Sequence, residues 1–209
     1  TYGHNFGTNL EWKKNNTNIY FNPSFSNSST KSSSLGDSES VDENGVLKNE
    51  TDSDVKSKSK SNTFSNLLSI NQKFKNKSYV DFSSNISIGK KDKDQKELSN
   101  AIFYDGSRDN TNRHVNSKNI SKNDSYNFDL KYTLPITDSI NIAIGSAYNL
   151  SNSETNNTSL NYNNLTGEYE EINTDLSRFF KTNLNQFNPY AQFLLNKSKL
   201  SASIRVGAE

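Results

Sequence analysis

The stretch SYNFDLKYTLPITDSINIAIGSAYNL, residues 125–150, alternates apolar and polar side chains on both sides of a short turn. The apolar residues occupy every second position before the turn and again after it: Tyr126, Phe128, Leu130, Tyr132 and Leu134, then Ile140, Ile142, Ile144, Tyr148 and Leu150. A period of two places successive side chains on opposite faces of a β-strand. This stretch therefore predicts a β-hairpin whose strands each have one apolar face.

The same design recurs along the chain. Alternating runs flank KKNNTN (13–18), KNKS (75–78) and NKSK (196–199), each rich in the residues that tight turns prefer. We expect four hairpins, at approximately 4–28, 63–90, 124–150 and 188–209. Long polar segments join them at 29–62, 91–123 and 151–187, and we expect these to be loops.

The composition narrows the class of protein. Only 30% of the 209 residues are hydrophobic, which is too few for a conventional core covered by helices, while the 11% aromatic residues fall within the alternating runs. The net charge of +1 gives no indication of nucleic-acid binding. Lys56, Lys58 and Lys60 alternate with Ser, and we interpret them as part of a solvated loop.

Several features are missing from the sequence. It contains no Cys, which excludes a disulfide framework, and no Met, which suggests a fragment of a longer protein. It has no segment of about 20 apolar residues and no signal peptide. Transmembrane β-strands need only about 9–11 residues with one apolar face, so they remain compatible with this sequence.

Short turns that alternate with long loops are typical of outer-membrane β-barrels. We therefore predict an all-β, antiparallel up-and-down transmembrane β-barrel in the bacterial outer membrane, with short periplasmic turns, long extracellular loops and lipid around it. About eight strands are present. The residues opposite the apolar faces are small or neutral polar, such as Ser83, Asn127, Ala143 and Ser201, which suits a wide lumen and hence part of a larger barrel.

The aromatic residues suggest two girdles at the membrane interfaces. Trp12, Phe74 and Tyr132 lie beside the short turns. Phe64, Tyr126 and Tyr190 lie at the long-loop ends of their strands. The alternative is that aromatic residues simply favour β-strands.

Three stretches resemble the outer-membrane β-barrel region of TonB-dependent receptor-like proteins of Bacteroidota. They are YTLPITDSINIAIGSAYNLS (132–151), NNLTGEYEEINTDLSRFF (163–180) and NPYAQFLLNKSKLSASIRVGAE (188–209). This resemblance implies uptake of a nutrient or metal chelate, with a plug domain inside the barrel and energy from the TonB complex. The chain itself would supply the wall and the extracellular loops.

Enzymatic motifs are absent from the sequence, and we predict no catalytic residue, metal site or cofactor. His114 shares a polar segment with Asp105 and Asp109, which is weak evidence for catalysis. The acidic stretches DSESVDENG (37–45) and YDGSRDN (104–110) lack the EF-hand spacing, so we interpret them as solvated loops.

A small ligand or oligosaccharide is expected to contact aromatic and arginine side chains of the loops. The candidates are Phe103, Tyr104, Arg108, Tyr162, Tyr169, Arg178 and Phe179. The alternative, which we favour slightly, is that these segments extend the hairpins and the aromatics pair across strands. Two other functions stay open: a secreted or surface β-sandwich binding module, and a non-transport outer-membrane barrel such as an adhesin or assembly component.

Overall fold

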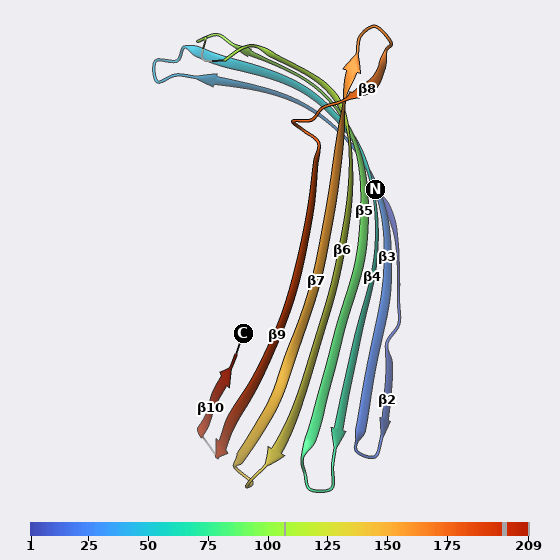
Figure 1. Cartoon of the computed structure of the whole chain (residues 1–209), viewed down its shortest axis with the longest axis vertical. Helices are drawn as coiled ribbons and strands as arrows, with labels where there is room; N and C mark the ends of the chain where they lie inside the picture. The colour runs from blue at the N-terminus through green and yellow to red at the C-terminus, as the bar shows by residue number, and fades with distance from the viewer. Residues whose placement is uncertain (107, 198–199, 209) are drawn as a thin grey trace.

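Ten β-strands account for most of the chain in this computed structural model, which describes residues 1–106, 108–197 and 200–208 (Figure 1). No helix occurs in these residues, so none is long and apolar enough to cross a membrane. The strands are β1 (Tyr2–Gly7), β2 (Leu10–Lys14), β3 (Thr17–Val41), β4 (Leu47–Lys73), β5 (Tyr79–Phe103), β6 (Thr111–Pro135), β7 (Ile140–Asn163), β8 (Glu168–Ile172), β9 (Arg178–Lys197) and β10 (Leu200–Gly207).

The strands form one antiparallel sheet in the order β1-β3-β4-β5-β6-β7-β9-β10. β2 also pairs with β3, below β1, so β1 and β2 together line one edge; β8 adds a short pairing to β7. The predicted all-β, antiparallel up-and-down arrangement is thus confirmed. The sheet is open: in the part of the chain that the structure describes, β10 pairs only with β9, and β1 and β2 only with β3.

The predicted long loops are largely strand, which corrects our interpretation of 29–62, 91–123 and 151–187. β3 and β4 pair without a break from Thr17 and Gln72 to Ser40 and Asn49, and the register shifts before the last pair, Val41 and Leu47. The Lys–Ser alternation at 56–60 has the same period of two as the apolar runs, and the backbone hydrogen bonds continue through it. Hydroxyl groups also meet across strands, with Oγ atoms 2.8 Å apart in Ser32 and Ser57.

The turns between β3 and β4 and between β4 and β5 are short. At the upper end of Figure 1, Asp42 Oδ1 accepts hydrogen bonds from the backbone N–H groups of Asn44 and Val46, and Gly45 has a φ of 80°. At the lower end, the Phe74 amide donates to the Ser78 carbonyl and Lys77 has a φ of 64°. These turns reverse the chain without interrupting the neighbouring pairings.

The register places almost all large apolar residues of the lower half on one face. We call their set the apolar belt and this side the belt face; the opposite side is the polar face. The belt comprises Phe6, Leu10, Trp12, Ile19, Phe21, Phe25, Phe64, Leu68, Ile70, Val80, Phe82, Ile86, Ile88, Tyr126, Phe128, Leu130, Tyr132, Leu134, Ile142, Ile144, Tyr148, Leu150, Phe187, Pro189, Ala191, Phe193, Leu195, Leu200, Ala202, Ile204 and Val206.

No second layer covers this belt in the described residues, as Figure 1 shows. Ile144 and Phe187 keep 57% and 58% of their surface exposed, and Ile204 keeps 67%. A β-sandwich buries such a face against a second sheet. The sandwich alternative therefore has no support from the packing within this chain.

The belt runs obliquely across the strands. Its uppermost residue is Phe25 on β3 and Phe187 on β9. The row of directly paired residues that starts at Phe25 reaches β9 at Asn183, four residues above Phe187. The upper limit of the belt therefore descends by four residues over five strand-to-strand steps, about 0.8 residue per strand. With a rise of about 3.3 Å per residue and about 4.8 Å between strands, a level belt tilts the strands by about 29°, somewhat less than the roughly 35–45° of transmembrane barrels.

Candidate functional site

The polar face is a wall of small neutral side chains. On β3 it presents Ser24, Ser26, Ser28, Thr30, Ser32 and Ser34, and on β4 Ser57, Ser59, Ser61, Thr63 and Ser65. Its lower and middle parts continue with Ser83, Asn85, Asn127, Ala147 and Asn149. Such a surface offers many hydrogen-bond donors and acceptors and little net charge.

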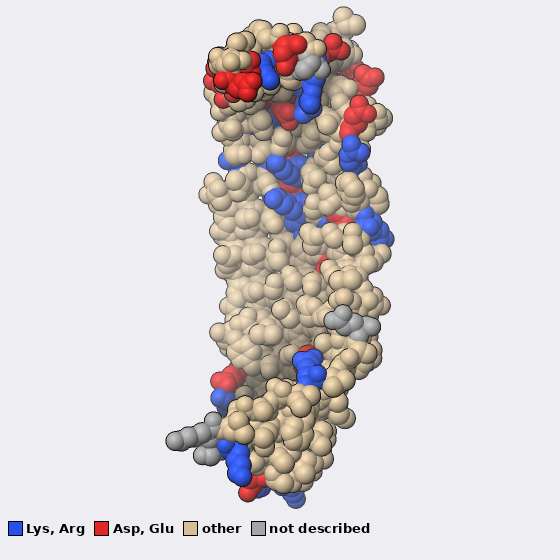
Figure 2. Space-filling model, turned by 90° about the vertical axis from the view of Figure 1, so that its left-hand side faces the viewer, with Lys and Arg blue, Asp and Glu red and all other residues tan. Residues whose placement is uncertain are grey.

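Charged side chains are distributed unevenly along the molecule (Figure 2). In that view, acidic side chains gather at the top end, most basic ones lie below them, and the stretch further down is nearly free of charge. A second group of charges lies near the lower end. The candidate site therefore has two levels, one near the lower end of the sheet and one in its upper half.

At the lower level, one row of directly paired residues crosses the polar face. It contains Lys13, Asn18, Asn71, Asp81, Lys131, Gly145, Tyr190 and Gly207. Lys131 Nζ lies 3.1 Å from Asp81 Oδ2, and Asn71 Nδ2 donates to Asp81 Oδ1. This row connects neighbouring strands by side-chain contacts as well as by the backbone.

Tyr190 lies on the polar face, which separates it from the other predicted interface aromatics. It pairs with Gly145, and a Cβ atom at Gly145 would lie 2.6 Å from the tyrosine ring. The Arg205 guanidinium lies 3.6 Å from the ring centroid, within cation–π range. In NPYAQFLL both alternating sets contain large residues, so the sequence did not reveal which set faces which way.

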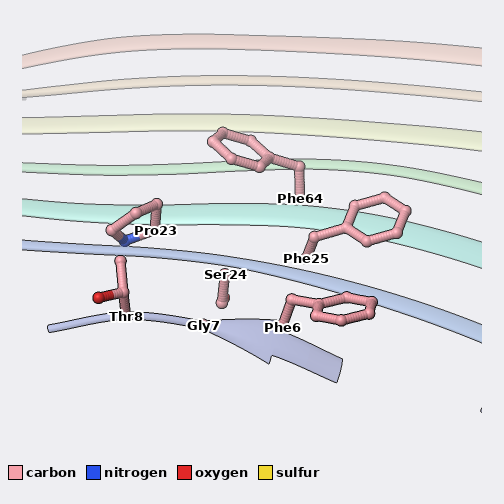
Figure 3. Close-up of a pocket in the computed structure, with 7 residues that line it drawn as sticks. All are labelled: Phe6, Gly7, Thr8, Pro23, Ser24, Phe25 and Phe64. Carbon is pink, nitrogen blue, oxygen red and sulfur yellow. The ribbon is translucent and has the colours of Figure 1, made fainter. Parts of the chain in front are cut away.

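Four of the other predicted interface aromatics share the belt face. Trp12 and Tyr132 lie toward the short turns, and Phe64 and Tyr126 lie at the upper margin of the belt. Phe74 lies in the turn after β4. Figure 3 shows Phe64 beside Phe25 and Phe6, which pair directly across three strands. The three rings line a shallow apolar hollow of about 320 Å³ near the β1 edge.

At the upper level, the polar face contains a hollow of about 480 Å³. Hydroxyl and amide side chains line much of it: Gln95, Ser117, Asn119, Thr155 and Asn157. The other lining residues are the basic Lys93 and Arg178, the acidic Asp175 and the apolar Leu176 and Phe180. Its volume lies in the range of small-molecule sites. Phe180 supplies an apolar surface among groups that suit a hydroxylated or acidic ligand.

The segment 173–177 forms one wall of this hollow and is attached to β7. Asn157 Nδ2 donates to the Leu176 carbonyl at 2.7 Å, and the Ser159 amide donates to Ser177 Oγ at 3.0 Å. The Arg178 guanidinium donates to the Asp175 carbonyl at 2.9 Å. The wall is thus held by hydrogen bonds at several points.

The seven predicted ligand contacts fall into separate places. Arg178 lines the polar-face hollow, whereas Phe179 points to the belt face because neighbouring residues alternate. Phe103, Tyr104 and Arg108 lie at the upper tip, where the Arg108 guanidinium is 6.0 Å from the Phe103 ring. Phe180 and Lys93 were not among the predicted contacts, because above the belt no apolar face indicates how the residues of RFF are oriented.

Tyr162 and Tyr169 form an aromatic cluster with His114. The rings of His114 and Tyr162 stack with centroids 4.0 Å apart, and Tyr169 shares a 2.9 Å hydrogen bond with His114 Nε2. Lys96 Nζ lies 5.3 Å from the Tyr169 ring centroid. Burial raises the pKa of Tyr169, and the charge of Tyr162 adds to this. The cluster pairs aromatics across strands, as the alternative interpretation expected.

Metal binding has no geometric support in the described part of the chain, since no three His, Cys, Asp or Glu residues converge there. Asp42 in the acidic stretch 37–45 is used as a turn residue. At the tip, the Tyr104 hydroxyl donates to Glu50 Oε2 at 3.0 Å. A scan against protein-family models and a search of curated proteins give no match for this chain.

Proposed function

We propose that this chain forms part of the wall of a transmembrane β-barrel in the bacterial outer membrane, in a transporter of the TonB-dependent receptor class. The observation that carries the proposal is the level apolar belt on an uncovered face of a single sheet. On β5 it spans Val80 to Ile88, about 26 Å along the strand and about 23 Å in height after tilting. The apolar band of outer-membrane barrels is about 25 Å tall.

The open edges support a barrel larger than this sheet. An unpaired strand edge cannot lie in lipid, because its backbone groups would have no hydrogen-bond partner. The outer edges of β10 and of β1 and β2 therefore pair with further strands of the barrel. Enclosed by such a wall, the neutral polar face lines a lumen that holds water and a plug domain.

The upper hollow supports capture of a small ligand or oligosaccharide from outside. In this role Phe180 stacks on an apolar ring face while Arg178 and the neighbouring amides bind oxygen atoms. We expect Phe180→Ala to weaken binding of such a ligand severalfold and Phe179→Ala, on the belt face, to leave it unchanged. Calorimetric titration with a panel of oligosaccharides and metal chelates measures this difference.

The orientation can be tested with cysteines, since the chain has none of its own. Asn44→Cys lies in the turn at the upper end and Lys75→Cys in a turn at the lower end. We expect a membrane-impermeant maleimide to label Asn44→Cys on intact cells and Lys75→Cys only after permeabilisation. Recovery of the protein in a soluble or secreted fraction would contradict the proposal.

A further inference from the structure

A band of lysines lies on the belt face directly above the apolar belt. In the four rows of paired residues that begin at Asn27, Ser29, Lys31 and Ser33 of β3, this face carries nine lysines and three carboxylates. The lysines are Lys31, Lys56, Lys58, Lys60, Lys90, Lys96, Lys118, Lys122 and Lys181, and the carboxylates are Asp92, Asp94 and Glu154. We call these nine residues the lysine band, and all of them are exposed.

The excess of positive charge is larger on this face than on the polar face. At the same level the polar face presents mainly Ser, Thr and Asn, with the basic residues Lys91, Lys93 and Arg178 and the acidic residue Glu97. Only Lys56, Lys90 and Lys122 of the lysine band form ion pairs within the described residues, at 2.9–3.5 Å. Lys96 Nζ lies over the Tyr169 ring, and the other ammonium groups are available to an external anion.

The sign of the charge reverses further from the belt. Asp37, Glu39, Glu50, Asp52 and Asp54 follow on the belt face at the tip of β3 and β4. Along this face an uncharged belt is therefore succeeded by a basic zone and then by an acidic zone. An anionic layer at the edge of the belt would attract the basic zone and repel the acidic one.

The height of the lysine band matches a lipid headgroup layer that is thicker than that of a phospholipid. Lys90 lies two residues above Ile88, about 7 Å along the strand, and Lys56 lies eight residues above Phe64, about 26 Å along it. The headgroup region of a phospholipid leaflet is only about 5–8 Å thick. The upper lysines therefore reach only headgroups that extend well beyond the acyl chains.

Two hollows on the lysine band have the size to accept anionic groups. Lys58, Lys60 and Lys118 line one of about 120 Å³ together with Asp92 and Asp94. Lys122 and Lys181 line another, of about 420 Å³, beside Glu154. The apolar hollow at Phe6, Phe25 and Phe64 lies at the upper margin of the belt, where acyl chains would lie (Figure 3).

We propose that the lysine band binds the phosphate groups of a lipid with an extended anionic headgroup, of the lipopolysaccharide class. This inference rests on the proposed function, because it requires the apolar belt to lie in the bilayer. The phosphates pair with exposed ammonium groups, and the long lysine stems follow the sheet toward them. The band thereby fixes the depth and the orientation of the wall.

The test compares a double variant of the lysine band with a polar-face variant at the same level. Lys60→Gln/Lys90→Gln removes two charges from the lysine band, whereas Lys91→Gln, next to Lys90 on β5, removes one charge from the polar face. The protein is folded in neutral detergent micelles, and fluorescence anisotropy of labelled lipopolysaccharide gives the dissociation constant. We expect the first variant to bind roughly thirtyfold more weakly, since each of its two lysines contributes about 1 kcal/mol near an anionic surface, and the second to bind like wild type.

A third variant and two further probes identify the source of the phosphate. Lys58→Gln/Lys118→Gln should weaken binding of lipopolysaccharide but not of phosphatidylglycerol, because these residues lie above a phospholipid headgroup. Equal losses in the band and control variants would overturn the proposal. Binding of inorganic pyrophosphate as tight as that of lipopolysaccharide would assign the band to a soluble anion and also overturn it.

Failure of the proposed function has a different signature. Full-length wild-type protein that does not insert into phosphatidylcholine vesicles contradicts the transmembrane wall itself. A chain that inserts into these vesicles but binds lipopolysaccharide no better than the Lys60→Gln/Lys90→Gln variant contradicts only the role of the lysine band. Circular dichroism of each variant shows that the sheet has formed before binding is measured.

Discussion

Gly145 and Tyr190 illustrate how a single residue can fix the position of a strand. The tyrosine ring lies where a side chain at Gly145 would project, and Arg205 covers the ring. An aromatic ring over a cross-strand glycine shields the exposed backbone and favours one register. This contact holds β9 against β7 on the polar face, where no apolar core does so.

Gly145→Ala should destabilise the fold. The added Cβ would lie 2.6 Å from the Tyr190 ring and 2.7 Å from the Leu130 carbonyl oxygen, so both must shift. We expect a loss of about 1–3 kcal/mol in the free energy of unfolding, measured by urea titration in micelles. Gly89→Ala is the matched control, because the nearest atom to its Cβ is 3.6 Å away. Equal effects would rule out a special role for Gly145.

Tyr104 offers a test of the structure at the tip. Its hydrogen bond to Glu50, then desolvation and the nearby carboxylates, raise the pKa of the phenol. The neutral phenol therefore stabilises the fold fully below the ordinary pKa of about 10 and loses this contribution as the pH rises through the raised value. Glu50→Gln should lower the pKa of Tyr104, as NMR titration of ¹³Cζ-labelled tyrosine will show. An unchanged pKa would mean that the contact does not form.

At the scale of the element, each long strand combines two environments on two faces. On β5, Ile86 belongs to the apolar belt, while Asn85 belongs to the polar face. Above Ile88 the same strand continues with Lys90 and Asp92 on the belt face. One strand thus spans the lipid-facing zone, the lysine band and the tip without a break.

Ile86→Lys and Asn85→Lys should differ sharply although they are adjacent. A lysine on the lipid-facing side costs about 2–4 kcal/mol near the middle of the bilayer, whereas a lysine facing a watery lumen costs little. Ile86 lies between the middle and the upper margin of the belt, where this cost is smaller. We expect only Ile86→Lys to reduce the free energy of unfolding in phosphatidylcholine vesicles, by about 1–3 kcal/mol. Similar stabilities of the two variants would indicate that both faces meet water.

The sequence predicted the belt strands well because apolar residues mark one face. Because Phe82, Ile86 and Ile88 all lie on one side of β5, they determine which side of the strand belongs to the belt face. Above the belt, Lys56 to Lys60 alternates charged with neutral residues, a period-two pattern without an apolar signal, and we interpreted it as loop. The candidate site lies in this upper region. There Arg178 and Phe180 of β9 lie in one hollow with Lys93 of β5, and this grouping depends on strand registers that only the folded sheet defines.

At the scale of the whole molecule, the sheet is organised by height. The belt face changes from apolar to basic to acidic toward the tip, while the polar face stays largely neutral up to the ligand hollow. Both edges are open in the described residues. A wall segment of a wide barrel explains the level belt, the neutral lumen side and the unpaired edges together.

The open edges lead to a prediction about the complete barrel. In the 209-residue chain alone, outer-edge amides of β10 and β2 have no backbone partner among the described residues, whereas β5 is paired on both sides. We expect hydrogen exchange in micelles to be fast for the unpaired amides and slow for β5. Within the full-length barrel the edge amides should become as protected as those of β5. Fast exchange there would contradict continuation of the sheet.

The central claim is that one face of the sheet meets lipid and the other meets water. The most direct test attaches a nitroxide label at each residue from Val80 to Ile88, one at a time, in protein reconstituted into vesicles. We predict that oxygen relaxes the label most at Val80, Phe82, Ser84, Ile86 and Ile88, and that a water-soluble nickel chelate does so at Asp81, Ser83, Asn85 and Ser87. Equal access of the nickel chelate to all nine positions would contradict the account.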